Sequence, residues 1–161
     1  MSVILAFSGG PDSTYLLHNL LKKNEDVLPI YFDHGLRSPE DIKNDLSYLK
    51  IPYIKRKIPV KSYAKKHGIS IEASGRYWRY RLLKHFQKLK KIPTVMTAHH
   101  FDDHIETFYL NFHRGYRHSL EGIQERQPFG CGELVRPLLK ITKGEILDYL
   151  ASNNIPFSNA L

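Results

Sequence analysis

The first 23 residues predict a β-strand, a glycine turn and an α-helix, in that order. The apolar run Val3–Ala6 leads into Phe7-Ser8-Gly9-Gly10-Pro11-Asp12-Ser13, and leucines then recur every fourth residue from Leu16. This order is the opening of an α/β unit. Because glycine has no Cβ, a ligand can approach the backbone closely at the turn.

The chemistry of this turn favours a phosphate chain as its ligand. The following helix directs free N–H groups and the positive end of its dipole at the turn. Ser8 and Ser13 add hydroxyl donors, and the Asp12 carboxylate is a candidate ligand for a metal ion bound to phosphates. The alternative is a plain turn in which Asp12 or Ser13 caps the helix. The turn lacks both the lysine of a Walker loop and the spaced glycines of a dinucleotide fingerprint.

Composition limits the classes of protein to which the chain can belong. Its 161 residues, 42% of them hydrophobic, predict one soluble globular domain. No run is long enough for a membrane span or a signal sequence. The single cysteine, Cys131, excludes an internal disulfide and a multi-cysteine site built by this chain alone, which fits the cytoplasm. The net charge of +8 favours a polyanionic partner.

The second predicted strand, Val27–Phe32, delivers polar residues to the same place as the glycine turn. Pro29 is expected near its start, because proline cannot donate to a central ladder. The strand ends in Asp33-His34-Gly35-Leu36-Arg37. In an open α/β sheet, ligands bind beyond the carboxyl ends of the strands, so Asp33 and His34 are expected beside the glycine turn. The alternative is a solvated loop.

Periodicity and turn residues predict the remaining elements. In the longest helix, Leu82, Phe86 and Leu89 are expected to face the sheet. A helix is predicted to start at Ser38-Pro39-Glu40 and to run to 50. The other predicted elements are an edge strand at 51–58, helices at 60–67 and 71–91, a strand at 93–98, a helix that continues through 108–112 to Arg114-Gly115, a loop-rich segment at 116–132, a strand at 134–138 and a helix from the Thr142–Glu145 capping box to 152.

Cations alternate with aromatic residues in Arg76-Tyr77-Trp78-Arg79-Tyr80-Arg81. Arginine can bind phosphate in a bidentate fork, and aromatic rings can stack on an unpaired base. We interpret Arg76 and Arg79 as binding residues. The alternative is strong for Trp78 and Tyr80, because such rings more often pack in the core or at its rim.

The segment that follows the 93–98 strand is dense in ionisable residues: His99-His100-Phe101-Asp102-Asp103-His104-Ile105-Glu106-Thr107. On a helix, Asp103 and Glu106 lie three residues apart and their carboxylates can converge. We favour a carboxylate pocket for an amine or for magnesium. The alternatives are a transition metal on the histidines, and a helix capped by Asp102 with solvated histidines.

Taken together, these segments resemble the N-terminal catalytic domain of the tRNA(Ile)-lysidine synthetases, which are N-type ATP pyrophosphatases with a PP-loop. The matching pieces run in the family's order along nearly the whole chain. They are Ser8–Ser13, Asp33–Arg37, Glu72-Ala73 with Arg76 and Arg79-Tyr80, Ala98–Thr107, Arg114-Gly115, Gly122-Ile123 and Arg136–Leu139.

The resemblance implies a single-domain, Rossmann-like, doubly wound parallel sheet that binds ATP and Mg²⁺. It also implies an activity: the family adenylates the wobble cytidine in the anticodon of an isoleucine tRNA, and free lysine then displaces AMP to give lysidine. By this resemblance, ATP is expected to bind to Ser8, Gly9, Gly10, Asp12, Ser13 and His34, and magnesium to Asp12 and Asp103. The expected catalytic residues are Asp33, Arg79, Asp103 and Glu106. The expected RNA-binding residues are Arg37, Arg76, Arg79, Arg114 and Arg136. We add the hypothesis that His99 or His100 accepts a proton from the attacking amine.

Two features distinguish the chain from that pattern. Family members usually continue into helical and C-terminal domains that hold the tRNA. The acidic-Asp-Pro-Ser-Asn segment that usually follows the last helix is also reduced, to residues 157–159. We therefore expect a minimal or truncated member, a homo-oligomer, or a second chain that supplies the missing part. The alternative functions are tRNA 2-thiolation with a partner that brings the sulfur, small-molecule amidation, and ATP binding without turnover.

Overall fold

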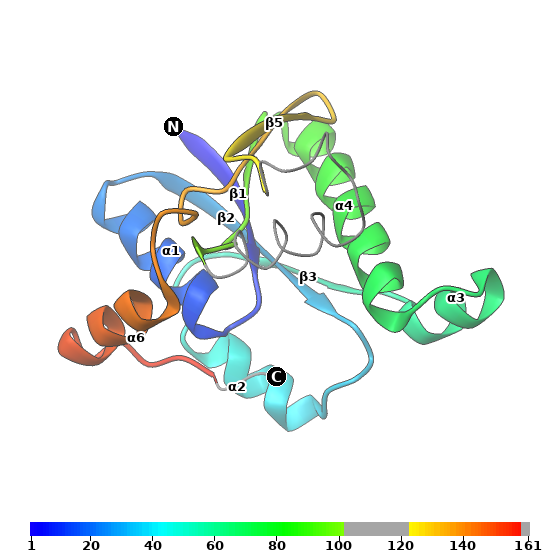
Figure 1. Cartoon of the computed structure of the whole chain (residues 1–161), viewed down its shortest axis with the longest axis horizontal. Helices are drawn as coiled ribbons and strands as arrows, with labels where there is room; N and C mark the ends of the chain where they lie inside the picture. Colours follow the sequence, from blue (N-terminus) through cyan, green and yellow to red (C-terminus); the bar gives the residue numbers. More distant parts are fainter. Residues whose placement is uncertain (102–122, 159–161) are drawn as a thin grey trace, which may run out of the picture.

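The structure is a computed structural model that describes residues 1–101 and 123–158, in which one six-stranded sheet carries helices on both faces (Figure 1). The elements are β1 (Ser2–Phe7), α1 (Pro11–Lys22), β2 (Asp26–Asp33), α2 (Pro39–Ser47), β3 (Ile54–Lys57), α3 (Val60–His67), α4 (Ile71–Lys90), β4 (Thr94–Met96), β5 (Arg126–Phe129), β6 (Gly132–Val135) and α6 (Lys143–Ser152).

The strand order is β3-β2-β1-β4-β6-β5, with β5 antiparallel to β6 and every other pair parallel. From β1 the chain moves outward through β2 to β3, and then crosses back to place β4 on the other side of β1. The connections that leave the carboxyl ends of β1 and β4 therefore diverge, which opens a crevice at that edge of the sheet. The predicted α/β class is confirmed.

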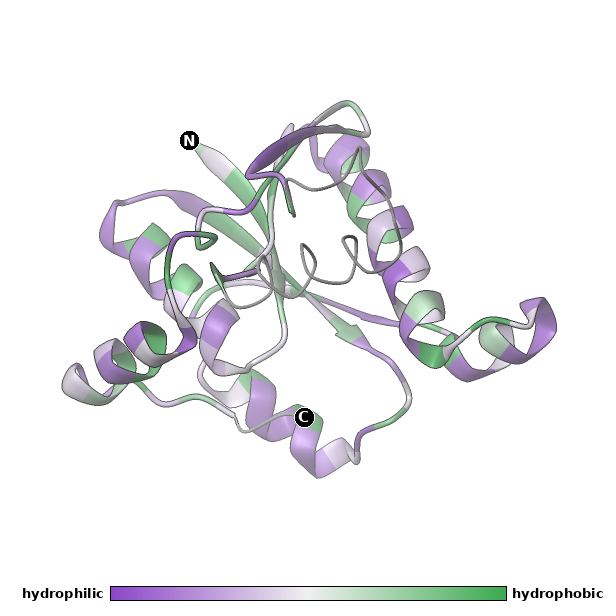
Figure 2. Cartoon of the chain, in the orientation of Figure 1, coloured by the Kyte–Doolittle hydropathy of each residue, from purple (hydrophilic) through white to green (hydrophobic). Residues whose placement is uncertain are grey.

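The core lies in two layers, one on each face of the sheet. On one face α1 and α6 pack Leu16, Leu20 and Ile146 against β1 and β2. On the other face α3 and α4 pack Val60 and Phe86 against β2 and β4. The strands β1 and β2 are mostly hydrophobic, whereas the helices carry both hydrophobic and hydrophilic residues (Figure 2). The sheet is thus covered on both sides, as a parallel sheet requires.

The helix boundaries follow from local chemistry. Ser70 caps α4 by accepting a hydrogen bond from the Ala73 N–H, and the predicted capping box of Thr142 and Glu145 opens α6. α1 differs, because its N-cap is Gly10 and no side chain accepts from its first turn. The alternative in which Asp12 or Ser13 caps α1 is therefore wrong. No helix within residues 1–101 and 123–158 is long and apolar enough to cross a bilayer.

Three details of the sequence-based prediction are wrong. Pro29 lies in the middle of β2, but the ladder with β3 starts only at Ile30, so β2 has a neighbour on one side alone at Pro29. Leu89 is 59% exposed, and Leu83 takes the expected place beside Phe86 against the sheet. Part of the segment expected to be loop-rich forms β5, which pairs with β6 across a tight turn.

Candidate active site

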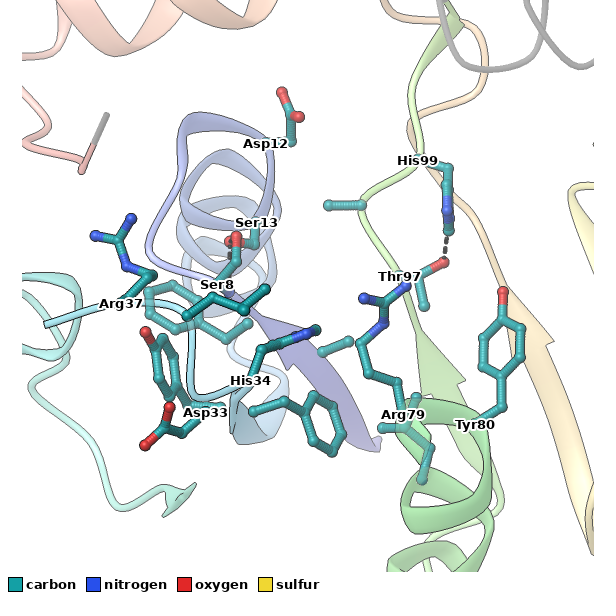
Figure 3. A pocket seen from close by; sticks show the side chains of 17 residues that line it. Ser8, Asp12, Ser13, Asp33, His34, Arg37, Arg79, Tyr80, Thr97 and His99 are labelled. Atoms are coloured by element: carbon teal, nitrogen blue, oxygen red, sulfur yellow. Dashed lines mark hydrogen bonds between the residues drawn. The ribbon is translucent and has the colours of Figure 1, made fainter. Parts of the chain in front are cut away.

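A cavity of about 460 Å³ opens at the carboxyl edge of the sheet, where the topology places the crevice. Its lining comes from the ends of β1, β2 and β4, the first turn of α1, and α4 (Figure 3). The polar residues that line it are Ser8, Asp12, Ser13, Tyr31, Asp33, His34, Arg37, Arg79, Tyr80, Thr97 and His99.

The turn between β1 and α1 is held open by its own hydrogen bonds. The Ser13 hydroxyl accepts from the Ser8 N–H at 3.1 Å and lies 3.2 Å from the Ser8 hydroxyl, while Ser8 Oγ accepts from the Gly10 N–H at 3.3 Å. Gly9 has φ +82°, and a Cβ there would lie 2.8 Å from Cβ of Asp45. The backbone therefore passes where only glycine fits, and both hydroxyls stay at the cavity wall.

The Asp12 carboxylate is contacted from two other elements. Lys143 Nζ of α6 lies 2.8 Å from Asp12 Oδ1, and His100 Nε2 lies 3.5 Å from Asp12 Oδ2. His100 is 7% exposed and forms an isolated β-bridge with Leu138. The contacts bring the start of α1, the end of β4 and the start of α6 together around one negative charge.

His34 and Arg79 approach one another across the cavity (Figure 3). A Cβ on Gly75 of α4 would lie 3.2 Å from Nδ1 of His34 and 3.6 Å from Nη1 of Arg79, so the glycine lets both side chains pass close to the helix. Burial, followed by the Arg79 charge, lowers the pKa of His34 below its ordinary 6.5, against an opposing effect of Asp33. We infer that His34 is neutral at pH 7.

Arg79 is the cation that α4 presents to the cavity. Burial is the main cause that lowers the pKa of its guanidinium, and the charge of Arg76 acts in the same direction, while Tyr80 and Glu72 oppose it. Arginine stays protonated under such conditions. The cavity therefore holds a fixed positive charge in a partly desolvated place, where it acts more strongly on an anion than it would in water.

The buried carboxylate of Asp45 holds Arg37 and Tyr31, two residues that line the cavity. Asp45 is wholly buried, accepts a hydrogen bond of 2.6 Å from the Tyr31 hydroxyl, and forms an ion pair of 2.9 Å with Arg37 Nη2. Burial and this hydrogen bond raise the pKa of Tyr31. Since Asp45 also contacts Gly9, the one residue fixes both the glycine turn and Arg37.

The two histidines that follow β4 occupy different places. His99 lines the cavity, and its Nδ1 lies 2.8 Å from Oγ1 of Thr97 (Figure 3). His100 does not line the cavity and lies against Asp12. The hydrogen bond to Thr97 fixes the orientation of the His99 ring.

The structure places the predicted site residues in different surroundings. One cavity is lined by Asp33, His34, Arg37, Arg79 and His99, together with most of the predicted residues of the glycine turn. Arg76 is exposed, with its guanidinium 5.4 Å from the centre of the Tyr80 ring. Arg136 is 4% exposed and donates to Gln124 O and Gln127 Oε1. Arg136 is thus held by protein acceptors, and its role in RNA binding stays a prediction. Asp103, Glu106 and Arg114 lie outside the described residues.

Four residues that contribute to the site carried only weak signals in the sequence. Lys143 was predicted only as part of a helix start, and Asp45 and Gly75 lie inside helical patterns. Gly75 had a local signal, since glycine inside a helix costs about 1 kcal/mol relative to alanine and usually has a packing reason. Thr97 could not be distinguished from an ordinary strand residue.

Comparisons with known proteins agree with this geometry. A family model described as PP-loop domain matches residues 1–160. The tRNA(Ile)-lysidine synthase of Bacillus subtilis is 32% identical over 166 residues, which cover 97% of this chain and 35% of the relative. The enzyme of the same name from Streptococcus gordonii is 36% identical over 144 residues, covering 88% and 34%. The chain thus spans about a third of the length of these relatives.

Among solved structures, the U34-tRNA thiolase NcsA from Methanococcus maripaludis matches with a TM-score of 0.77 and 17% identity, over 100% of this chain and 60% of that chain. A likeness at this identity concerns the fold, and it confirms the predicted Rossmann-like architecture. With the sheet, the glycine turn and a family match along almost its whole length, the chain belongs to the PP-loop domain family.

Proposed function

We propose that the chain is an ATP-dependent tRNA-modifying enzyme of the lysidine synthase type. In this proposal it transfers AMP from ATP to the wobble cytidine of an isoleucine tRNA, and lysine then replaces AMP. The observation that carries the proposal is the convergence of the glycine turn with His34, Arg79 and His99 on one cavity. The names of the curated relatives and the net charge of +8 support an RNA substrate.

The phosphates of ATP would bind at the start of α1. Gly10 caps this helix without a side-chain acceptor, so its first N–H groups are available to phosphate oxygens, and the hydroxyls of Ser8 and Ser13 lie beside them. Asp33 and His34, at the end of β2, would line the side of the cavity that takes the nucleoside.

Magnesium fits this site through Asp12. Mg²⁺ in nucleotide sites is commonly held by one or two carboxylates together with substrate phosphates, and Asp12 is a carboxylate at the cavity wall. Bound there, the ion would neutralise charge on the phosphates. Lys143 and His100 contact the two oxygens of Asp12 in this structure, so at least one of these contacts would have to break when the ion binds. Asp103 stays a proposed second ligand.

In the first step, O2 of the cytidine attacks the α-phosphorus of ATP. An O–P bond forms, the bond between the α-phosphorus and the bridging oxygen breaks, and pyrophosphate leaves. Arg79 would stabilise the negative charge that develops on the phosphate oxygens, since its guanidinium is fixed and partly desolvated.

In the second step, the lysine amine attacks C2 of the cytosine ring. A C–N bond forms, the C2–O2 bond breaks, and AMP leaves with the electron pair while the amine loses a proton. His99 would accept that proton, because it lines the cavity and Thr97 orients its ring. Asp103 and Glu106 are the proposed carboxylates for the incoming lysine.

Product analysis tests the proposal. The chain is incubated with ATP labelled at the α-phosphate, Mg²⁺, lysine and an isoleucine tRNA, and the nucleotides are separated. AMP and pyrophosphate are expected, with steady turnover only when both lysine and tRNA are present. Turnover that needs ammonia in place of tRNA would indicate small-molecule amidation, and turnover that needs a sulfur donor would indicate thiolation. ADP, or no product, would contradict the proposal.

A further inference from the structure

The charge of this protein is distributed very unevenly along the chain. Residues 51–101 contain 13 of the 24 Lys and Arg residues but only one of the 16 Asp and Glu residues, Glu72. The rest of the chain has 11 cationic and 15 acidic residues, so the whole positive excess comes from the segment that forms β3, α3, α4 and β4. A pattern of this kind is the electrostatic footprint of a polyanion site.

Most of these cations face solvent, and within the described part of the chain none of them forms an ion pair. Twelve of the 13 are exposed, and Arg79 is the exception. The ion pairs among residues 1–101 and 123–158 all involve other positions. Self-repulsion of this density opposes folding, and a bound polyanion would relieve it.

Aromatic rings are built into the same surface. Tyr63 of α3 stacks on Tyr77 of α4 with ring centroids 4.8 Å apart and an angle of 11° between the planes. Arg81 donates to the Tyr77 hydroxyl at 3.0 Å and lies over the Trp78 ring. Tyr77 remains 40% exposed, so a ring with an orientation fixed by its neighbours is available to solvent. We call the exposed residues of α3 and α4 around this pair of rings the α3–α4 face; its cations used below are Lys61, Lys65, Lys66 and Arg81, and its rings are Tyr63 and Tyr77.

Helix α4 connects this face to the cavity. Arg79 and Tyr80 line the cavity, whereas Tyr77 and Arg81, in the same stretch of helix, belong to the α3–α4 face. The two sites are therefore separated by little more than the width of one helix, roughly 10 Å. An RNA stem–loop bound by its phosphates on the face would have to span about that distance to bring one nucleotide of its loop to the cavity.

We propose that the α3–α4 face is an RNA-binding surface of this chain. Its cations bind the phosphate backbone of a stem–loop, and one base stacks on Tyr77. It lies outside the cavity and on the opposite face of the sheet from α1 and α6. The choice of RNA as the polyanion rests on the proposed function. The charge asymmetry and the stacked rings do not depend on it.

Two triple variants with equal charge test the inference. Lys61→Gln/Lys65→Gln/Lys66→Gln removes three cations from the face, and Lys22→Gln/Lys23→Gln/Lys43→Gln removes three exposed cations from α1, α2 and their flank. Binding of a fluorescent RNA stem–loop with a cytidine at the wobble position is measured by anisotropy between about 50 and 200 mM salt. Thermal melting and ATP titration show whether both variants remain folded.

The first triple should weaken RNA binding at least about tenfold and reduce the slope of log K against log salt by about two to three. The control triple should change affinity less than about twofold, with ATP affinity unaltered in both. Tyr77→Ala should weaken binding by about fivefold or more, and Tyr77→Phe should retain it. Equal losses in the two triples, or wild-type protein that binds ATP but no RNA, would overturn the inference. Displacement of the bound RNA by anionic lipid vesicles would also overturn the inference.

The same variants separate this inference from the proposed function. If the first triple alone loses RNA but the wild type releases no AMP with tRNA and lysine, the α3–α4 face stands and the proposed reaction fails. If the wild type modifies tRNA and both triples bind it equally, the reaction stands and the face is wrong.

Discussion

Lys143 Nζ lies 2.8 Å from Asp12 Oδ1, although the two residues are 131 positions apart in the sequence. One belongs to the first turn of α1 beside the glycine turn, and the other to the first turn of α6. The contact places a competing cation on the carboxylate that we propose for magnesium. Binding of Mg²⁺ with ATP is then an exchange of partners at Asp12.

The first prediction follows from that exchange. Lys143→Gln should lower the Mg²⁺ concentration needed for half-maximal ATP binding by about two- to fivefold, because the ion no longer competes with an ammonium. Both side chains are partly exposed, at 36% and 28%, so the stability change should stay under about 1 kcal/mol. Calorimetric titration of ATP at several Mg²⁺ concentrations measures the effect, with Lys140→Gln as the exposed control. Weaker ATP binding at saturating Mg²⁺ would instead assign Lys143 to the phosphates.

The second prediction concerns the close approach of Gly9 to Asp45. Gly9→Ala should destabilise the fold by about 2 to 5 kcal/mol, because φ is +82° and the new Cβ would meet backbone and Cβ atoms of Asp45 within 3.0 Å. Gly35→Ala is the matched control: its φ is +71° and nothing lies within 4 Å, so only the conformational cost of about 1 to 2 kcal/mol applies. Urea unfolding gives both values. Equal losses would show that the contact with Asp45 contributes nothing.

The sequence predicted the parts of the fold that depend on local pattern. The glycine turn, the edge position of the strand near Ile54, and the capping box at Thr142 all follow from residue types within one element. Strand β5 was missed because Pro128, Gly130 and Gly132 favour a loop, and pairing with β6 overrides that preference.

The site was predictable where residues follow a strand, and not where tertiary packing decides. Asp33, His34 and His99 were expected at this edge because parallel strands bring their carboxyl ends together there, and all three line the cavity. The pairing of Asp12 with Lys143 and the burial of Arg136 depend on how α6 and β6 dock, and no spacing within the sequence encodes that.

The third prediction is a pH dependence from His34. Its pKa in the folded protein lies below 6.5, so the unfolded state binds its proton more readily, and folding stability contributed by the neutral ring is lost as the pH falls below 6.5. The free energy of unfolding of wild type minus that of His34→Gln should therefore be smaller at about pH 5.5 than at about pH 7.5. The exposed His85→Gln variant is the control. A difference that grows as the pH falls would contradict the assignment.

The fourth prediction separates the two histidines after β4. His99→Asn should slow lysine attack by about a hundredfold while adenylate formation stays within a few-fold of wild type, because only the second step needs a proton acceptor at that position. His100→Asn should act mainly through Asp12, and therefore through ATP binding. Rapid quenching resolves pyrophosphate release from AMP release. Equal loss of both steps in His99→Asn would refute its role as proton acceptor.

The proposed function requires that this cavity transfer AMP to a cytosine. Mass spectrometry of tRNA incubated with the protein, ATP and Mg²⁺, first without and then with lysine, tests it most directly. We expect an AMP adduct on one anticodon cytidine, which is converted to a lysine adduct when the amine is supplied. Unmodified RNA in both reactions, accompanied by ADP or by intact ATP, would contradict it.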